Sequence, residues 1–191
     1  MSKQQALASV RQHFSAGHFE ADLRRRVAIR SESQAPGQAH ELARYLHDEM
    51  QPALERMGFA CQPLQNPTGA GPLLFAERHE SADLPTVLTY GHGDVVLGYA
   101  EQWREGLDPW VLTVEGDRWY GRGTADNKGQ HSINLAALEA VINARRGDWG
   151  LTSRCCLKPV KNAVRPACVR SARLTKRCCT PMCLSPRTVR A

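Results

Sequence analysis

A histidine and two aspartates stand at positions that could support metal chemistry. His92 and Asp94 lie in the segment Gly-His-Gly-Asp at residues 91–94, and Asp126 lies in Tyr-Gly-Arg-Gly-Thr-Ala-Asp-Asn-Lys-Gly at residues 120–129. A neutral imidazole suits zinc, and the two oxygens of an aspartate can bridge two cations. Asp94 follows His92 by two residues, so in an extended chain it lies on the same side and can orient the imidazole. We therefore predict His92 and Asp126 as metal ligands and Asp94 as the catalytic-site residue that holds His92.

Each of these residues also has a simpler explanation. An isolated His-x-Asp is common, Asp126 could be the N-cap of a helix, and Gly121-Arg-Gly123 could be an ordinary turn. The elements around them favour a site, because His92 and Asp126 both come where a strand or hairpin has just ended.

The hydrophobic pattern predicts an α/β layered domain that positions these residues. Residues 3–30 and 40–57 have helical spacing, with Gly58 as a C-terminal cap and Pro52 as the place of a kink. Strands are expected at 59–63, 73–77 and 86–90, the last as a buried parallel strand, and a hairpin at 110–120 around Gly116-Asp117. A helix is expected from 128 to 146, where Gly129 would let it start tightly against the preceding loop.

Charge and cysteine are distributed very unevenly along the 191 residues. The formal charge is +6, yet residues 151–191 hold ten lysines and arginines and no acidic residue. Six of the seven cysteines also lie in this last part of the chain. The amino-terminal residues lack the apolar core of a signal peptide, and no segment is long and apolar enough to span a membrane. The expected location is the cytoplasm.

Several motifs in fixed order resemble one enzyme family. They are Thr-Tyr-Gly-His-Gly-Asp-Val-Val at 89–96, Trp103, Asp-Pro-Trp at 108–110 and Trp-Tyr-Gly-Arg-Gly-Thr-Ala-Asp-Asn-Lys-Gly at 119–129. Over roughly residues 10–147 the chain resembles the zinc-dependent amidohydrolases that include acetylornithine deacetylase, succinyl-diaminopimelate desuccinylase, glutamate-releasing carboxypeptidases and cytosolic dipeptidases. Leu97 and Gln130-His131 depart from the family pattern, and none of them corresponds to a ligand.

The resemblance implies a truncated catalytic domain of a di-zinc exopeptidase-like fold, a mixed sheet flanked by helices that lacks its later strands and its dimerisation domain. His92 would bind one zinc ion, Asp126 would bridge two, Asp94 would support His92, and the Asp126-Asn127 peptide would be cis. Cobalt or manganese are alternative metals. The implied reaction is hydrolysis of an amide bond in an N-acyl amino acid or a small peptide by a zinc-bound hydroxide. The expected binding partner is the substrate, a small molecule or a peptide. The family is usually homodimeric.

The rest of the family's site is missing from the translated chain. The family needs a Glu-Glu pair on the next strand, but no acidic residue follows Asp148. When the codons of residues 157–168 are read one nucleotide out of register, they allow Glu-Thr-Gly-Glu-Glu-Cys-Gly-Ser-Pro-Gly-Leu. Residues 181–191 allow Asp-Val-Phe-Val-Ala-Ser-Asp-Gly-Pro-Arg in the same way. We interpret this as a frame slip near residue 147, which predicts that the chain is inactive.

Two regions follow from this interpretation. Residues 1–147 are the amino-terminal part of the hydrolase domain, and residues 148–191 are an out-of-frame, basic, cysteine-rich tail that we expect to be disordered. The alternative is a non-catalytic α/β domain whose tail binds nucleic acid. Adjacent cysteine pairs, no tail histidine and no interleaved aromatics argue against both a zinc finger and specific nucleic-acid binding.

Overall fold

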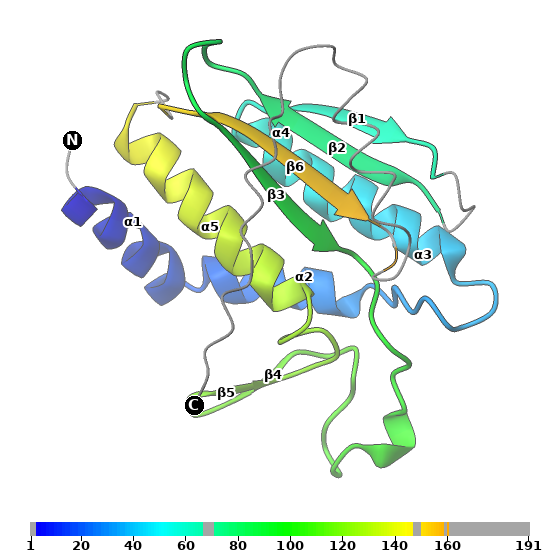
Figure 1. Cartoon of the computed structure of the whole chain (residues 1–191). Helices are drawn as coiled ribbons and strands as arrows, with labels where there is room; N and C mark the ends of the chain where they lie inside the picture. The colour runs from blue at the N-terminus through cyan, green and yellow to red at the C-terminus, as the bar shows by residue number, and fades with distance from the viewer. Residues whose placement is uncertain (1–2, 67–70, 147–149, 159, 161–191) are drawn as a thin grey trace, which may run out of the picture.

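The protein folds as helices packed around a mixed β-sheet, as described by a computed structural model (Figure 1). The structure describes residues 3–66, 71–146, 150–158 and 160. The expected α/β class is therefore confirmed, and the strands and helices fall close to the places that the hydrophobic pattern predicts.

Four strands form the main sheet in the order β1-β2-β6-β3. Their bounds are Ala60–Leu64 for β1, Leu73–Arg78 for β2, Thr86–His92 for β3 and Thr152–Lys158 for β6. The pairs β1–β2 and β2–β6 are antiparallel, whereas β3 and β6 are parallel, with Thr86 opposite Thr152 and His92 opposite Lys158. The sheet is mixed, as the family resemblance implied.

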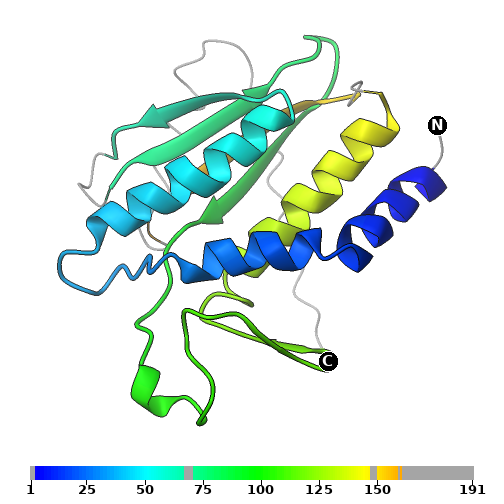
Figure 2. The same ribbon diagram turned by 180° about the vertical axis from the view of Figure 1, so that it is seen from behind.

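One long helical segment covers a face of this sheet (Figure 2). It consists of α3 at Ala39–Arg44, a π-helical stretch at Tyr45–Met50 and α4 at Gln51–Arg56. The predicted irregularity at Pro52 is thus present as a π segment that ends just before the proline. Gly58 has φ of 81° directly after the helix, as expected for its carboxyl-terminal cap.

Among the described residues there are three further α-helices, and a short 3-10 helix lies at Ala100–Gln102. The three α-helices are α1 at Lys3–Ser15, α2 at His18–Ala28 and α5 at Lys128–Ala144. Helix α5 packs against α1 and α2 and runs beside β3 in both ribbon views. A small hairpin, β4 at Thr113–Glu115 and β5 at Arg118–Tyr120, precedes α5. The hairpin is shorter than predicted, because residues 110–112 lie outside its paired strands.

The main core lies between the long helical segment and one face of β2 and β6. Leu74 and Ala76 of β2 stand opposite Leu157 and Cys155 of β6, and all four pack in this core. The helices supply most of the rest of the cluster, which includes Tyr45, Leu46, Met50, Leu54 and Leu135. Alternate residues of each strand therefore face the helices. The residues between them, such as Leu73, Phe75 and Cys156, are buried as well, so neither face of β2 and β6 is open to solvent.

The prediction of a buried strand at residues 86–90 is wrong. Within the described part of the chain β3 is an edge strand, and Val87, Leu88 and Tyr90 are 43%, 50% and 55% exposed. An uninterrupted apolar run is the pattern of a strand that is covered on both faces. Here no described element covers the outer side of β3, so its apolar side chains remain accessible.

Strand β6 also corrects the expectation of a disordered tail. The predicted tail starts at residue 148, yet Thr152–Lys158 form the strand between β2 and β3 and are mostly buried. Both flanking strands offer unpaired backbone groups to this segment, and pairing satisfies them. The remainder of the predicted tail, residues 159 and 161–191, lies outside the described residues.

Candidate metal centre

The three predicted site residues come together at the carboxyl end of β3. His92 is the last residue of β3 and is 6% exposed. Its Nδ1 lies 2.9 Å from Oδ1 of Asp94, and its Nε2 lies 3.0 Å from Oδ1 of Asp126. The imidazole is therefore held between two carboxylates, one buried and one open to solvent.

The loop before α5 brings Asp126 to this position. The Asp126-Asn127 peptide is cis, as the resemblance implied. Asn127, not Asp126, is the N-cap residue of α5, so the helix-cap alternative for Asp126 is wrong. The side chain of Asp126 is 53% exposed and faces a hollow of about 340 Å³ lined also by His92, Val95, Arg122 and Thr124. Asp126 is thus accessible, whereas its histidine partner is not.

Two residues that the sequence analysis did not single out hold the backbone around His92. The backbone N–H of His92 donates to Oδ1 of Asn127 at 3.2 Å. The hydroxyl of Ser31, which is fully buried, donates to the carbonyl of Gly93 at 2.7 Å, and the N–H of Val95 donates to the carbonyl of Ser31. Nothing in the local sequence around Ser31 indicates this contact, because its partners lie more than 60 residues away.

A buried lysine fixes the start of α5 beneath the site. Lys128 is 1% exposed, and its ammonium donates to the carbonyl of Ile29 at the end of α2. The ammonium also lies 5.4 Å from the ring centre of Tyr45 and 5.9 Å from that of Trp110. Burial lowers the pKa of Lys128 to about 7, against the opposing effect of Glu41 and Glu32. Lys128 belongs to the sequence motif at residues 120–129, but only the fold shows that its side chain is buried.

His131 lies next to this cluster and is held in its neutral form. Its Nδ1 lies 2.8 Å from the hydroxyl of Tyr45. Burial, and then the positive charges of His92, Arg26 and Lys128, lower the pKa of His131 to about 3. The ring of His131 is therefore fixed between Tyr45 and Gly91.

The fit of a metal ion to this site is partial. Two ligands of one tetrahedral zinc ion, each roughly 2.0–2.2 Å from the metal, lie slightly more than 3 Å apart. The 3.0 Å between Nε2 of His92 and Oδ1 of Asp126 is close to that spacing, and Asp94 occupies the other ring nitrogen. However, no group of three or more histidine, cysteine or acidic side chains that could hold a metal occurs among the described residues. As predicted ligands, His92 and Asp126 would supply two of the four that zinc needs.

The ionisation of His92 gives a testable consequence of this arrangement. Burial alone would lower the pKa of His92, but Asp94 and then Asp126 outweigh it and raise the pKa above the usual 6.5. A raised pKa in the folded state adds stability that is complete below about pH 6.5 and is lost as the pH rises through the folded-state pKa. We expect Asp94→Asn to lower the pKa of His92 more than Asp126→Asn does, because Asp94 is buried and makes the larger contribution.

An NMR titration of the His92 ring in the wild-type chain and the two variants measures this order. Asp48→Asn is a suitable control, since Asp48 lies on the exposed side of the long helix beside His47. A larger effect of Asp126→Asn would show that the exposed carboxylate, and not the buried one, controls the imidazole.

Comparison with known proteins shows which proteins the central segment of the chain resembles. Residues 88–152, which include most of β3, the site and α5, match the sequence model of Peptidase family M20/M25/M40. The chain is 43% identical over 70 residues to the cysteinylglycine-S-conjugate dipeptidase of Corynebacterium striatum, covering 36% of this chain and 15% of that protein. It is 37% identical over 98 residues to succinyl-diaminopimelate desuccinylase of Delftia acidovorans, covering 47% of this chain and 24% of that protein. The predicted resemblance is therefore confirmed for this segment.

Solved structures show the same fold. Human carnosine dipeptidase 1 superposes with a TM-score of 0.76 and 24% identity, over 88% of this chain and 37% of that one. An M20 family metallo-carboxypeptidase from Sulfolobus solfataricus gives a TM-score of 0.61 and 23% identity, over 74% of this chain and 30% of that one. The chain thus spans between about one seventh and about three eighths of the length of these four proteins.

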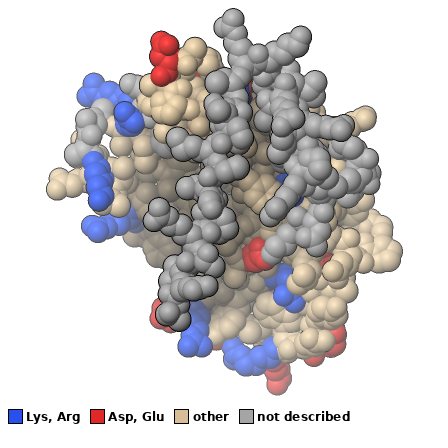
Figure 3. All heavy atoms as spheres, in the orientation of Figure 1, with Lys and Arg blue, Asp and Glu red and all other residues tan. Residues whose placement is uncertain are grey.

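No helix among the described residues is long and apolar enough to cross a lipid bilayer. On the face shown in Figure 3, lysine, arginine and acidic side chains are interspersed over the part drawn in colour. The nucleic-acid alternative concerned the tail at residues 148–191, most of which lies outside the described residues.

Proposed function

We propose that this chain, whose residues 88–152 match the peptidase family M20/M25/M40, is the amino-terminal part of a metal-dependent hydrolase that cleaves an amide bond. The substrate class is an N-acyl amino acid or a small peptide. The observation that carries the proposal is His92, which lies between Asp94 and Asp126 at the end of β3, within the matched segment. We also propose that the 191-residue chain is inactive by itself.

In this proposal the residues of the chain prepare one half of a zinc site. With zinc bound, Asp94 would accept the Nδ1 proton of His92, which would leave Nε2 as the nitrogen that holds the metal. Asp126 presents a partly exposed carboxylate to the same position. A bound zinc ion would lower the pKa of a water molecule to about 7 and polarise the carbonyl of the substrate. The family resemblance favours two zinc ions, with cobalt or manganese as alternatives.

The missing ligands are the reason for the proposed inactivity. The sequence has no acidic residue after Asp148, so the chain cannot supply the glutamate base and the further ligands that the family uses. We propose that these residues are encoded one nucleotide out of register after residue 147. Residues 1–147 would then be the hydrolase part and 148–191 a segment translated in the wrong frame, of which Thr152–Lys158 still pair as β6.

The test compares the present chain with a gene in which one nucleotide is inserted between codons 146 and 148. Both products are purified and assayed with zinc on N-succinyl-diaminopimelate, β-alanyl-histidine and a cysteinylglycine S-conjugate, the substrate types of the relatives. We expect turnover only from the frame-restored protein, and we expect His92→Ala and Asp126→Asn to abolish that turnover. A shifted frame that does not continue the enzyme sequence would refute the proposed parentage. Zinc-dependent turnover by the 191-residue chain would refute its inactivity.

A further inference from the structure

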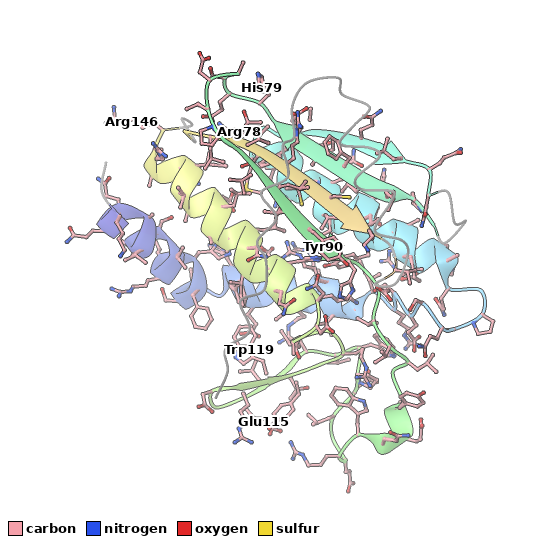
Figure 4. All side chains as sticks on the ribbon, viewed as in Figure 1. Arg78, His79, Tyr90, Glu115, Trp119 and Arg146 are labelled. Carbon is pink, nitrogen blue, oxygen red and sulfur yellow. The ribbon has the colours of Figure 1, made fainter. Side chains whose placement is uncertain are left out.

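Asn127 connects the two elements that supply the predicted metal ligands. Asp126, which precedes it, belongs to the loop before α5, whereas His92 is the last residue of β3. Figure 4 labels Tyr90, which lies two residues before His92 near the carboxyl end of this strand. The backbone N–H of His92 donates to Oδ1 of Asn127 at 3.2 Å. Asn127 is therefore joined to one predicted ligand by a peptide bond and to the other by a hydrogen bond.

The N–H of His92 faces the side of β3 on which the described sheet has no further strand. The next residue, Gly93, donates its N–H to the carbonyl of Lys158 in β6 at 2.8 Å. Successive N–H groups of a strand point to opposite sides, and β3 is the edge strand of the described sheet. A buried N–H needs an acceptor, and the side chain of Asn127 provides it for His92.

The side chain of Asn127 does not cap its own helix. Asn127 occupies the N-cap position of α5 but makes no capping hydrogen bond with its side chain. An N-cap asparagine ordinarily accepts from the N–H of the second or third helical residue. Here the N–H of Gly129, the second residue of α5, donates to the carbonyl of Gly123 at 3.1 Å. The loop carbonyl thus satisfies this N–H, and the oxygen of Asn127 is used by His92.

A second contact fixes the orientation of the Asn127 carboxamide. Its Nδ2 donates to Oε1 of Gln130 in the first turn of α5, while its Oδ1 accepts from His92. The amide oxygen and nitrogen cannot exchange places without the loss of both hydrogen bonds, because one only accepts and the other only donates. Asn127 is also buried, so the carboxamide is held at one place between α5 and β3.

We propose that Asn127 is a positioning residue that sets the distance between His92 and Asp126. This inference rests on the proposed function for the metal-binding roles of these two residues. Nε2 of His92 and Oδ1 of Asp126 lie 3.0 Å apart, and a shift of the loop relative to β3 would change this distance and break the contact with Asn127. Replacement of a residue that holds a metal ligand typically costs about 10–100-fold in metal affinity or activity.

Serine and aspartate at position 127 separate positioning from helix capping. Asparagine, aspartate and serine are about equally good N-cap residues, so a capping role predicts that both variants resemble the wild type. Aspartate keeps an oxygen at the place of Oδ1, whereas the serine hydroxyl is one bond closer to the backbone. We therefore expect Asn127→Asp to keep the contact with His92 and Asn127→Ser to lose it. Asn134→Ser, at an exposed position of the same helix, is the matched control.

NMR of the metal-free 191-residue chain measures the contact directly. We expect the amide hydrogen of His92 to exchange with solvent about tenfold faster in Asn127→Ser, as for the loss of one hydrogen bond, and to change less than about twofold in Asn127→Asp and Asn134→Ser. The nuclear Overhauser effect between the His92 ring and the Asp126 methylene protons should weaken only in Asn127→Ser. If Asn127→Ser leaves both signals as in the wild type, the proposal is wrong.

The zinc affinity of the frame-restored protein, measured by competition with a chelator, tests the consequence for the site. We expect Asn127→Ser to weaken zinc binding by about 10–100-fold, and Asn127→Asp and Asn134→Ser to bind zinc at least as tightly as the wild type within error. Equal zinc affinity of Asn127→Ser and the wild type would also overturn the proposal. A frame-restored protein that binds no zinc would refute the proposed function instead, and the NMR comparison, which needs neither metal nor activity, would still decide whether Asn127 sets the spacing.

Discussion

Replacing Gly129 with alanine is expected to remove a large share of the stability of the fold. A Cβ at this position would lie 1.8 Å from the carbonyl oxygen of Thr124 and 2.9 Å from its carbonyl carbon. Both are backbone atoms, so neither can rotate away as a side chain would. Overpacking in a rigid place costs about 1–3 kcal/mol and occasionally more, and we expect more than about 3 kcal/mol here. That is a large share of the roughly 5–15 kcal/mol that stabilises an ordinary domain.

This prediction opposes the one from helix propensity, which makes the experiment decisive. Gly129 lies in the first turn of α5, where alanine by itself would favour the helix by about 1 kcal/mol. Urea unfolding followed by circular dichroism measures which effect is larger. Asn134→Ala, at an exposed position in the same helix, is the control and should change stability by less than about 1 kcal/mol. A Gly129→Ala variant as stable as this control would show that the 124–126 loop does not lie against the helix as described.

Replacing Tyr45 with alanine is the second change that should have a large effect. Tyr45 is completely buried in the main core, and its hydroxyl lies 2.8 Å from Nδ1 of His131. Its ring also packs beneath the site, since a Cβ added to Gly93 would lie 2.8 Å from Cδ1 of Tyr45. Truncation of a buried aromatic side chain leaves a cavity and costs about 3–5 kcal/mol. We expect a loss of about 4 kcal/mol, measured as the free energy of unfolding.

Tyr45→Phe separates the packing contribution from the hydrogen bond. Phenylalanine keeps the ring and leaves Nδ1 of His131 without the hydroxyl, which should cost about 1–2 kcal/mol. The difference in the free energy of unfolding between the two variants then measures the packing contribution of the aromatic ring. Equal losses for alanine and phenylalanine would mean that the polar contact, and not packing, is what the core requires at this position.

The helices and strands could be predicted well because their signals are local. Helical spacing predicted α5 and a single helical stretch where the structure has α1 and α2, which are separated at Gly17, and the glycine after Met57 marked the end of α4. The π segment at Tyr45–Met50 could be anticipated only as a kink at Pro52, since one extra residue in a helical turn leaves no separate sequence signal.

Both errors in the predicted fold, at β3 and β6, concern which segments of the chain lie next to one another in space. The apolar run of β3 indicates a strand that packs well, but whether another strand covers it depends on elements elsewhere in the chain. Strand β6 was missed because its composition, Thr-Ser-Arg-Cys-Cys-Leu-Lys, has no alternation that favours a strand, and pairing with β2 and β3 overrides that weak local preference.

The candidate site, too, could be predicted only in part from the sequence. The order of motifs identified His92, Asp94 and Asp126, and the structure brings the three side chains within hydrogen-bonding distance of one another through His92. Their roles as metal ligands and support remain predictions. Ser31, Asn127 and Lys128, which hold these residues in place, carry no motif that shows this function, because their partners come from distant parts of the chain.

The sequence by itself determined which residues could do chemistry, since residue type and short spacing decide what can bind a metal and which side chains share one side of a strand. It also showed that the acidic partners are absent after Asp148. Only the tertiary structure decided that Lys128 is internal, that β3 is the edge strand of the described sheet, and that His131 is buried against Tyr45 and β3. Burial and pairing depend on segments that are far apart in sequence, and so they are properties of the assembled fold.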